Sequence, residues 1–143
     1  MTELVLDSCR RMVDQAIAFA RETSLNPLAV VVLDARGALR AAAAEDGASL
    51  ARWKIALGKA SAALALGMGT RKIAAAAVER PHFLAGLTTV LSDGIVPVPG
   101  GVLIRGENGE ILGAAGASGD TSDNDEAALV HAIKAAGLVP DAG

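Results

Sequence analysis

The first third of the chain shows two hydrophobic patterns in succession. Between Asp7 and Glu22 apolar residues recur every three or four positions, which is the spacing of one face of a helix, and Asp7 is placed to cap its first turn. The unbroken apolar run at residues 28–33 predicts a buried strand. A tight turn from Asp34 to Gly37 then leads into a second strand, because aspartate and glycine suit the two ends of such a turn. A helix followed by a β-hairpin is therefore expected.

The next segment predicts two consecutive helices. Ser49 is placed to cap a long helix, which the glycines before Thr70 should end, and Thr70 is placed to cap a shorter one that stops at Pro81. The apolar stripe predicted for the long helix is Leu50, Trp53, Leu57, Ala60 and Leu64.

The remaining pattern is mainly that of strands. Residues 82–94 show no clear periodicity, whereas strands are expected at 95–98 and on both sides of the Asn108-Gly109 turn, a strong hairpin signal. A last helix is expected over about 123–136, capped by Thr121 or by Asp123 itself. This order of elements is typical of an α/β (α+β) sandwich whose central, mostly antiparallel sheet is flanked by helices. We expect residues 1–143 to form a single domain.

Composition and charge favour a homo-oligomer and argue against a nucleic-acid-binding, membrane-spanning or disulfide-bonded protein. The chain is 52% hydrophobic but rich in alanine, with two phenylalanines and one tryptophan, so each residue buries little area and a homo-oligomer is expected to supply more. The net charge is −3 and no basic stripe carries interleaved aromatics, which argues against nucleic-acid binding. The apolar runs are too short or too interrupted for a membrane span, and the chain starts unlike a secretory signal, so we expect a soluble, cytoplasmic protein. The single cysteine, Cys9, excludes an internal disulfide and a multi-cysteine metal site, and it is expected in the core.

Three blocks of sequence resemble the GlcG/HbpS-like family in order and spacing. They are AVVVLDARGALRAAAAEDGAS, ALGKASAALALGMGTRKI and the segment PVPGGVLIR onward to Leu138. The most specific pieces are Pro99-Gly100-Gly101, the glycine-rich run ending at Gly119, and Asp125-Glu126. The family is labelled haem-binding or haem-degrading and is related to the C-terminal domain of PduO-type proteins. The resemblance implies a profilin-like fold, assembly from dimer to octamer, haem as candidate cofactor, and a pocket where the Pro-Gly-Gly loop, the long helix and the last helix meet.

Two candidate positions lie on the long helix and on that loop. Lys59 is a charge beside an apolar stripe: either its ammonium pairs with an anionic ligand group or serves as a base in a desolvated pocket, or it reaches past the core to solvent. Pro99, Gly100 and Gly101 either present bare backbone amides to an anion or form a turn before a strand.

The other candidates are acidic residues and a histidine. Asp125 and Glu126 stand at a helix start, where carboxylates complement the helix dipole, and either one near Lys59 would form an ion pair or a proton-transfer couple. His82, next to Phe83, is the better candidate for an axial bond to haem iron, while His131 is expected on the surface. The spacing of the two histidines makes a dedicated metal site unexpected.

Three functions remain open on these residues. The first is a small-molecule-binding protein that holds haem or a related tetrapyrrole in a homo-oligomer. The second is an enzyme of a catabolic pathway, in which Lys59 would hold a small organic acid or carbonyl compound while Asp125 or Glu126 moves a proton. Val98 stands where family members commonly carry an aromatic residue, which favours the smaller ligand. The third is a structural or regulatory oligomer with an empty pocket.

Overall fold

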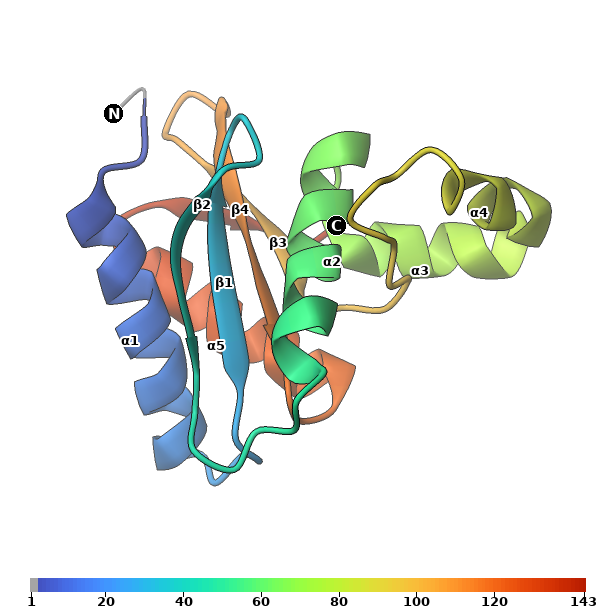
Figure 1. The fold of residues 1–143 in the computed structure, drawn as a ribbon. Coiled ribbons are helices and arrows are strands. Elements are labelled where there is room, and N and C mark those ends of the chain that lie inside the picture. The colour runs from blue at the N-terminus through green and yellow to red at the C-terminus, as the bar shows by residue number, and fades with distance from the viewer. Residues whose placement is uncertain (1–2) are drawn as a thin grey trace.

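A five-stranded antiparallel sheet forms the centre of the protein, in a computed structural model that describes residues 3–143 (Figure 1). The strand order is β2-β1-β4-β3-β5, and each strand runs antiparallel to its neighbours. This confirms the predicted α/β class with an antiparallel sheet flanked by helices. The elements in chain order are α1 (Leu6–Glu22), β1 (Ala29–Asp34), β2 (Leu39–Ala44), α2 (Arg52–Leu66), α3 (Thr70–Glu79), α4 (Pro81–Leu87), β3 (Gly101–Arg105), β4 (Ile111–Ser118), α5 (Ser122–Ala135) and β5 (Val139–Asp141).

The helices cover the sheet from both sides. Helices α1 and α5 lie on one face and α2 on the other, with α3 and α4 extending outward beyond α2 (Figure 1). Alternate residues of β1 serve the two layers, because successive side chains of a strand point to opposite faces. Val30 and Val32 join the core under α1 and α5, whereas Val31 and Leu33 join the core under α2. Cys9 is buried in the first of these cores, as predicted.

Helix α2 approaches the sheet through its small residues. A side chain at Gly116 of β4 would overlap the Ala56 carbonyl, so the helix backbone lies directly on the strand. The predicted apolar stripe is therefore only partly right. Ala60 is buried in the core under α2 and Leu57 and Leu64 pack against it, whereas Leu50 is 86% exposed and Trp53 is 46% exposed. Close contact selects alanine and glycine for the buried face and displaces the large apolar side chains to its borders. The buried residues of α2 are Ala56, Gly58, Lys59, Ala60, Ala62 and Ala63.

The segment before β3 differs from the prediction. Residues 95–98 form no strand, because prolines 97 and 99 lack the backbone donor that a ladder needs, and Val98 N instead donates to Val96 O at 2.8 Å. Most of the short helix α4, which begins at Pro81, lies in residues 82–94, where the sequence shows no clear periodicity. The edge strand β5 was not predicted, since three residues that include Pro140 give no periodic signal.

The helix caps were predicted with mixed success. Thr121 caps α5, and its side chain accepts a hydrogen bond from Asn124 N at 3.2 Å. Ser49 does not cap α2, which begins three residues later without a side-chain cap, and Thr70 is the first residue of α3 instead of its cap. Asp7 lies inside the first turn of α1 and pairs with Arg11. Among residues 3–143 no helix is long and apolar enough to cross a membrane.

Candidate functional site

A buried ion pair joins α2 to the start of α5. Lys59 Nζ donates to Asp125 Oδ2 at 3.3 Å and to the Ala117 carbonyl of β4 at 3.0 Å. Both charged side chains are only 2% exposed. The alternative in which Lys59 reaches past the core to solvent is therefore wrong, since the ammonium turns inward onto the sheet.

The aspartate of this pair is held by its own helix start. Asp125 Oδ1 accepts the Asp120 backbone N–H at 2.9 Å, so each carboxylate oxygen has a partner. Thr121 caps the same turn, and the first-turn carboxylate also lies at the positive end of the α5 dipole. Asp125 thereby fixes the entry into α5 and the position of the ammonium together.

The Pro-Gly-Gly loop passes directly over Lys59. Gly100 has φ +116°, and a Cβ built there would lie 2.7 Å from Lys59 Nζ. A Cβ at Gly101 would lie 2.5 Å from the Lys59 carbonyl oxygen. Both glycines are buried, and the half-buried Pro99 leads into them. The loop therefore needs bare backbone to cover the lysine, and the three elements expected to meet do come together.

Thr70 fastens this loop and was not predicted in that role. Its Oγ1 accepts the Gly101 N–H at 2.8 Å and lies 3.3 Å from the Gly101 carbonyl, to which it can donate. The residue is completely buried. The sequence marks Thr70 only as a helix-cap candidate, because its partner is 31 residues away and only the tertiary fold brings the two together.

Burial sets the electrostatics of the pair. Desolvation lowers the pKa of Lys59 below its ordinary value, and the nearby Asp125 charge offsets part of that shift. Desolvation likewise raises the pKa of Asp125, opposed by the hydrogen bond from Asp120 N–H and by Lys59. Burial therefore moves the two pKa values toward each other.

The structure separates the other candidates from this pair. Glu126 binds Arg71, with Glu126 Oε2 2.8 Å from Arg71 Nη2, and the same guanidinium also pairs with Asp123. His82 is exposed on α4, and no hydrogen bond or ion pair of the described residues joins it to Lys59. Only Asp125 of the predicted acidic pair meets the lysine.

His131 is exposed, as expected. Its ring stacks near Phe19 of α1, with the ring centroids 5.1 Å apart. Among residues 3–143 no group of three or more histidine, cysteine and acidic side chains is arranged to hold a metal ion.

Three surface cavities of the described residues lie away from the buried pair, whose side chains are only 2% exposed. One of about 390 Å³ lies at the β1–β2 turn beside Arg36 and Arg40, and one of about 440 Å³ lies between Arg21 and Asp46. The third, of about 340 Å³, is an apolar groove between α2 and β2 beside Trp53. A ligand can therefore reach Lys59 only if the Pro-Gly-Gly loop moves, whereas the groove is open.

Comparison with known proteins assigns the family. The model of the family described as haem degrading protein HbpS-like matches residues 4–134. The chain belongs to the HbpS-like family. A comparison with curated protein sequences gave no significant match.

Solved structures share the fold of this HbpS-like chain over nearly its whole length. The crystal structure of a PduOC–haem complex has a TM-score of 0.84 and 24% identity, with 95% of this chain and 96% of that chain covered. The Klebsiella pneumoniae protein ORFY, described as DUF336, has a TM-score of 0.84 and 26% identity, covering 96% and 92%. HbpS has a TM-score of 0.81 and 20% identity, covering 94% and 91%.

Proposed function

We propose that this protein binds haem or a related tetrapyrrole as a homo-oligomer. The observation that carries the proposal is the HbpS-like match over residues 4–134, in a family described as haem-degrading. It is supported by the PduOC structure, which is described as a haem complex and shares the fold over nearly the full length of both chains.

The described residues offer a surface for the macrocycle of haem but few candidate ligands for its iron. The apolar groove beside Trp53 offers an apolar wall of the kind that buries a ring system, and its volume of about 340 Å³ is within the range of small-molecule pockets. Its lining contains no histidine, cysteine, methionine or tyrosine. The candidate iron ligand remains His82, whose exposed position on α4 would hold iron at the molecular surface.

Titration with ferric haem tests the proposal. A specific site would produce a saturable change in the haem absorption band at a fixed ratio of haem to chain. A spectrum equal to the sum of free haem and free protein at every ratio would refute it. His82→Ala should remove any spectral signature of imidazole coordination, and His131→Ala is the matched control because it also exchanges an exposed histidine.

The oligomer in this proposal is supported by apolar side chains that remain exposed. Val78 of α3 is 84% exposed, and Phe83 of α4 and Val90 are also exposed in the part of the chain that extends beyond α2 (Figure 1). An interface between copies of the chain would remove these side chains from water. Native mass spectrometry of freshly purified protein would report the number of subunits and any retained ligand together, and a purely monomeric spectrum would contradict this part of the proposal.

The buried ion pair favours a second candidate function, acid–base catalysis on a small organic acid or carbonyl compound. Lys59 would hold the anionic group and Asp125 would move the proton once the Gly100 loop opens. The support is the desolvated pair itself, since perturbed titratable pairs cluster at functional sites. A screen of small hydroxy- and keto-acids should give turnover that Lys59→Met abolishes, and unchanged turnover in this variant would end the mechanism.

A further inference from the structure

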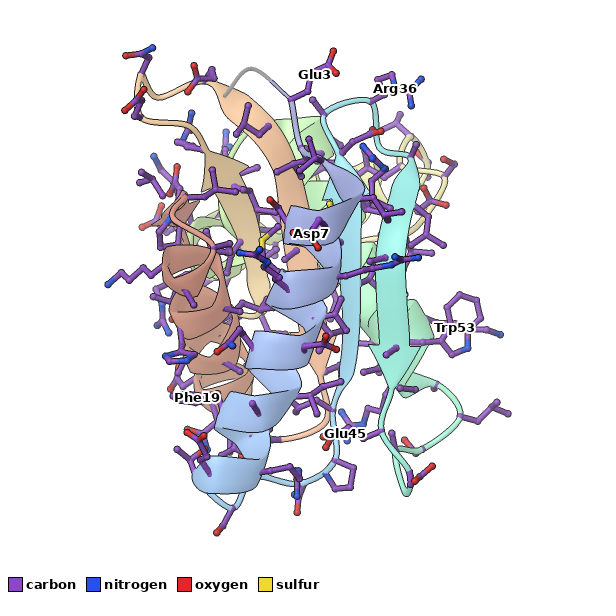
Figure 2. All side chains as sticks on the ribbon, turned by 90° about the vertical axis from the view of Figure 1, so that its left-hand side faces the viewer. Glu3, Asp7, Phe19, Arg36, Glu45 and Trp53 are labelled. Carbon is purple, nitrogen blue, oxygen red and sulfur yellow. The ribbon has the colours of Figure 1, made fainter. Side chains whose placement is uncertain are left out.

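The side of β2 that faces α2 is not covered by any described element. Helix α2 lies over β4, β1 and β3 and scarcely reaches β2, the edge strand of the sheet. Trp53 projects from the first turn of α2 beside this strand (Figure 2). The result is a groove with the helix as one wall and the strand as the other. Its lining includes Leu39, Ala42, Ala43, Ala44, Trp53 and Leu57.

The walls of the groove are almost wholly apolar and present little relief. In β2, Ala42 pairs with Val31 and Ala44 pairs with Ala29, so the strand wall consists of short side chains. On the other wall Trp53 is 46% exposed, and Leu39 at the end of the strand wall is 63% exposed. Leaving such side chains in water is unfavourable, and a low wall opposite an indole suits a flat ring system better than a chain of irregular shape.

Positive charge lies at the border of the groove. Lys54 Nζ is 5.7 Å from the centroid of the Trp53 ring, and the lining itself contains no acidic residue. The neighbouring Arg52 is half-buried and donates to Ser118 Oγ at 3.1 Å. A ligand with a flat apolar body and carboxylates at its edge would pack against the apolar walls and pair with the Lys54 ammonium.

We propose that this groove holds the macrocycle of a carboxylate-bearing tetrapyrrole, with Trp53 against the ring and Lys54 near a carboxylate. The proposal rests on the tetrapyrrole-binding function proposed above and specifies where the ligand lies. Because the lining offers no iron ligand, the ring contacts supply the affinity, and any ligand to the iron comes from outside the groove. Iron-free protoporphyrin and haem therefore bind with similar affinity.

The experiment compares two pairs of variants in titrations with iron-free protoporphyrin IX and with haem. Ala42→Glu places a carboxylate in the groove, and its control Ala75→Glu makes the same change on the exposed face of α3. Lys54→Glu reverses the charge at the border, and its control is Lys72→Glu, also on α3. Both groove variants alter exposed positions, so the fold should persist, which circular dichroism would verify.

Ala42→Glu should weaken binding of both ligands at least tenfold, equivalent to about 1.4 kcal/mol, while Ala75→Glu binds like the parent protein. Lys54→Glu should weaken binding and Lys72→Glu should not. The chain contains one tryptophan, so its single indole N–H resonance should shift when protoporphyrin binds.

Three outcomes would overturn the inference. If haem binds and both Ala42→Glu and Lys54→Glu bind it normally, the function stands but the site is elsewhere. If Ala42→Glu instead changes the oligomer mass without changing affinity, the groove is an interface between copies of the chain. If the parent protein binds neither ligand, the function and the site are both refuted.

Discussion

The ammonium of Lys59 lies 3.3 Å from Asp125 Oδ2 in an interior where both side chains are 2% exposed. Removing two charges from water is costly, and their attraction compensates only when the geometry and the additional hydrogen bonds are good. Here Ala117 O and Asp120 N–H supply those additional bonds. The pair therefore couples the position of α2 to the start of α5.

Breaking the pair from one side should destabilise the protein strongly. Lys59→Met leaves Asp125 buried without its counter-ion, and a loss of about 3–5 kcal/mol in the free energy of unfolding is expected. The double variant Lys59→Met/Asp125→Asn should lose less than the sum of the two single variants. Urea denaturation measures all three.

An exposed pair provides the control for this cycle. Arg11 and Asp7 lie 3.1 Å apart, with side chains 68% and 73% exposed, so Arg11→Met should cost less than about 1 kcal/mol. Similar losses for Lys59→Met and Arg11→Met would show that the buried pair contributes no more than a surface one.

Replacing Gly100 should be worse than replacing a glycine in open space. Gly100→Ala adds a Cβ 2.7 Å from Lys59 Nζ at a positive φ, whereas Gly37→Ala meets a positive φ alone, with nothing within 4 Å. Backbone strain should cost about 1–2 kcal/mol in each variant, and Gly100→Ala should lose more because the lysine has to move. Thermal unfolding of the two variants tests this, and equal losses would mean that the loop is not tight over Lys59.

Thr70→Val should loosen the Pro-Gly-Gly loop. The isosteric change removes the hydroxyl that accepts from Gly101 N–H and leaves that buried donor without a partner. A loss of about 1–3 kcal/mol in the free energy of unfolding is expected, and hydrogen exchange at the Gly101 amide should accelerate. Thr70→Ser keeps the hydroxyl and is the control. Unchanged Gly101 exchange in the valine variant would contradict the role of Thr70.

Asp120 should contribute to the loss of stability in acid. Its pKa is lowered by the hydrogen bond from the Asn124 amide and by the backbone N–H groups of Asn26 and Thr121. Because the folded pKa lies below the unfolded value, the stabilisation is complete above that unfolded value, near 3.8, and is lost as pH falls through the folded pKa. Asp120→Asn should therefore lose less stability than the parent protein between pH 7 and about pH 3. Asp14→Asn, an exposed change on α1, is the control, and parallel pH curves for Asp120→Asn and the parent would refute the assignment.

Local signals predicted the two hairpin turns and the cap of α5, because these features are encoded by a few neighbouring residues. The turns at Gly37 and Gly109 have φ +84° and +81°, as glycine allows, and Thr121 caps α5. The buried face of α2 was predicted only in part from hydrophobicity, because contact with Gly116 selects small residues over large ones such as Leu50 and Trp53.

The candidate site could be predicted only in part. The meeting of Lys59, Gly100 and Asp125 was expected from the resemblance to the GlcG/HbpS-like family. Glu126 follows Asp125 on a helix, so it points about 100° away around the helix axis and binds Arg71 instead. The groove beside Trp53 had no sequence signal, since it depends on how far α2 extends over the sheet.

The contact between Gly116 and Ala56 sets the distance between α2 and the sheet, and with it the position of the buried ion pair. Lys59 follows Ala56 by less than one turn of α2, so the thickness of this helix–sheet layer sets the depth of the ammonium. A single methyl group at position 116 would lift the helix and draw the cation away from Asp125, although neither charged residue had been altered. A substitution of the uncharged Gly116 would thus weaken the attraction between Lys59 and Asp125.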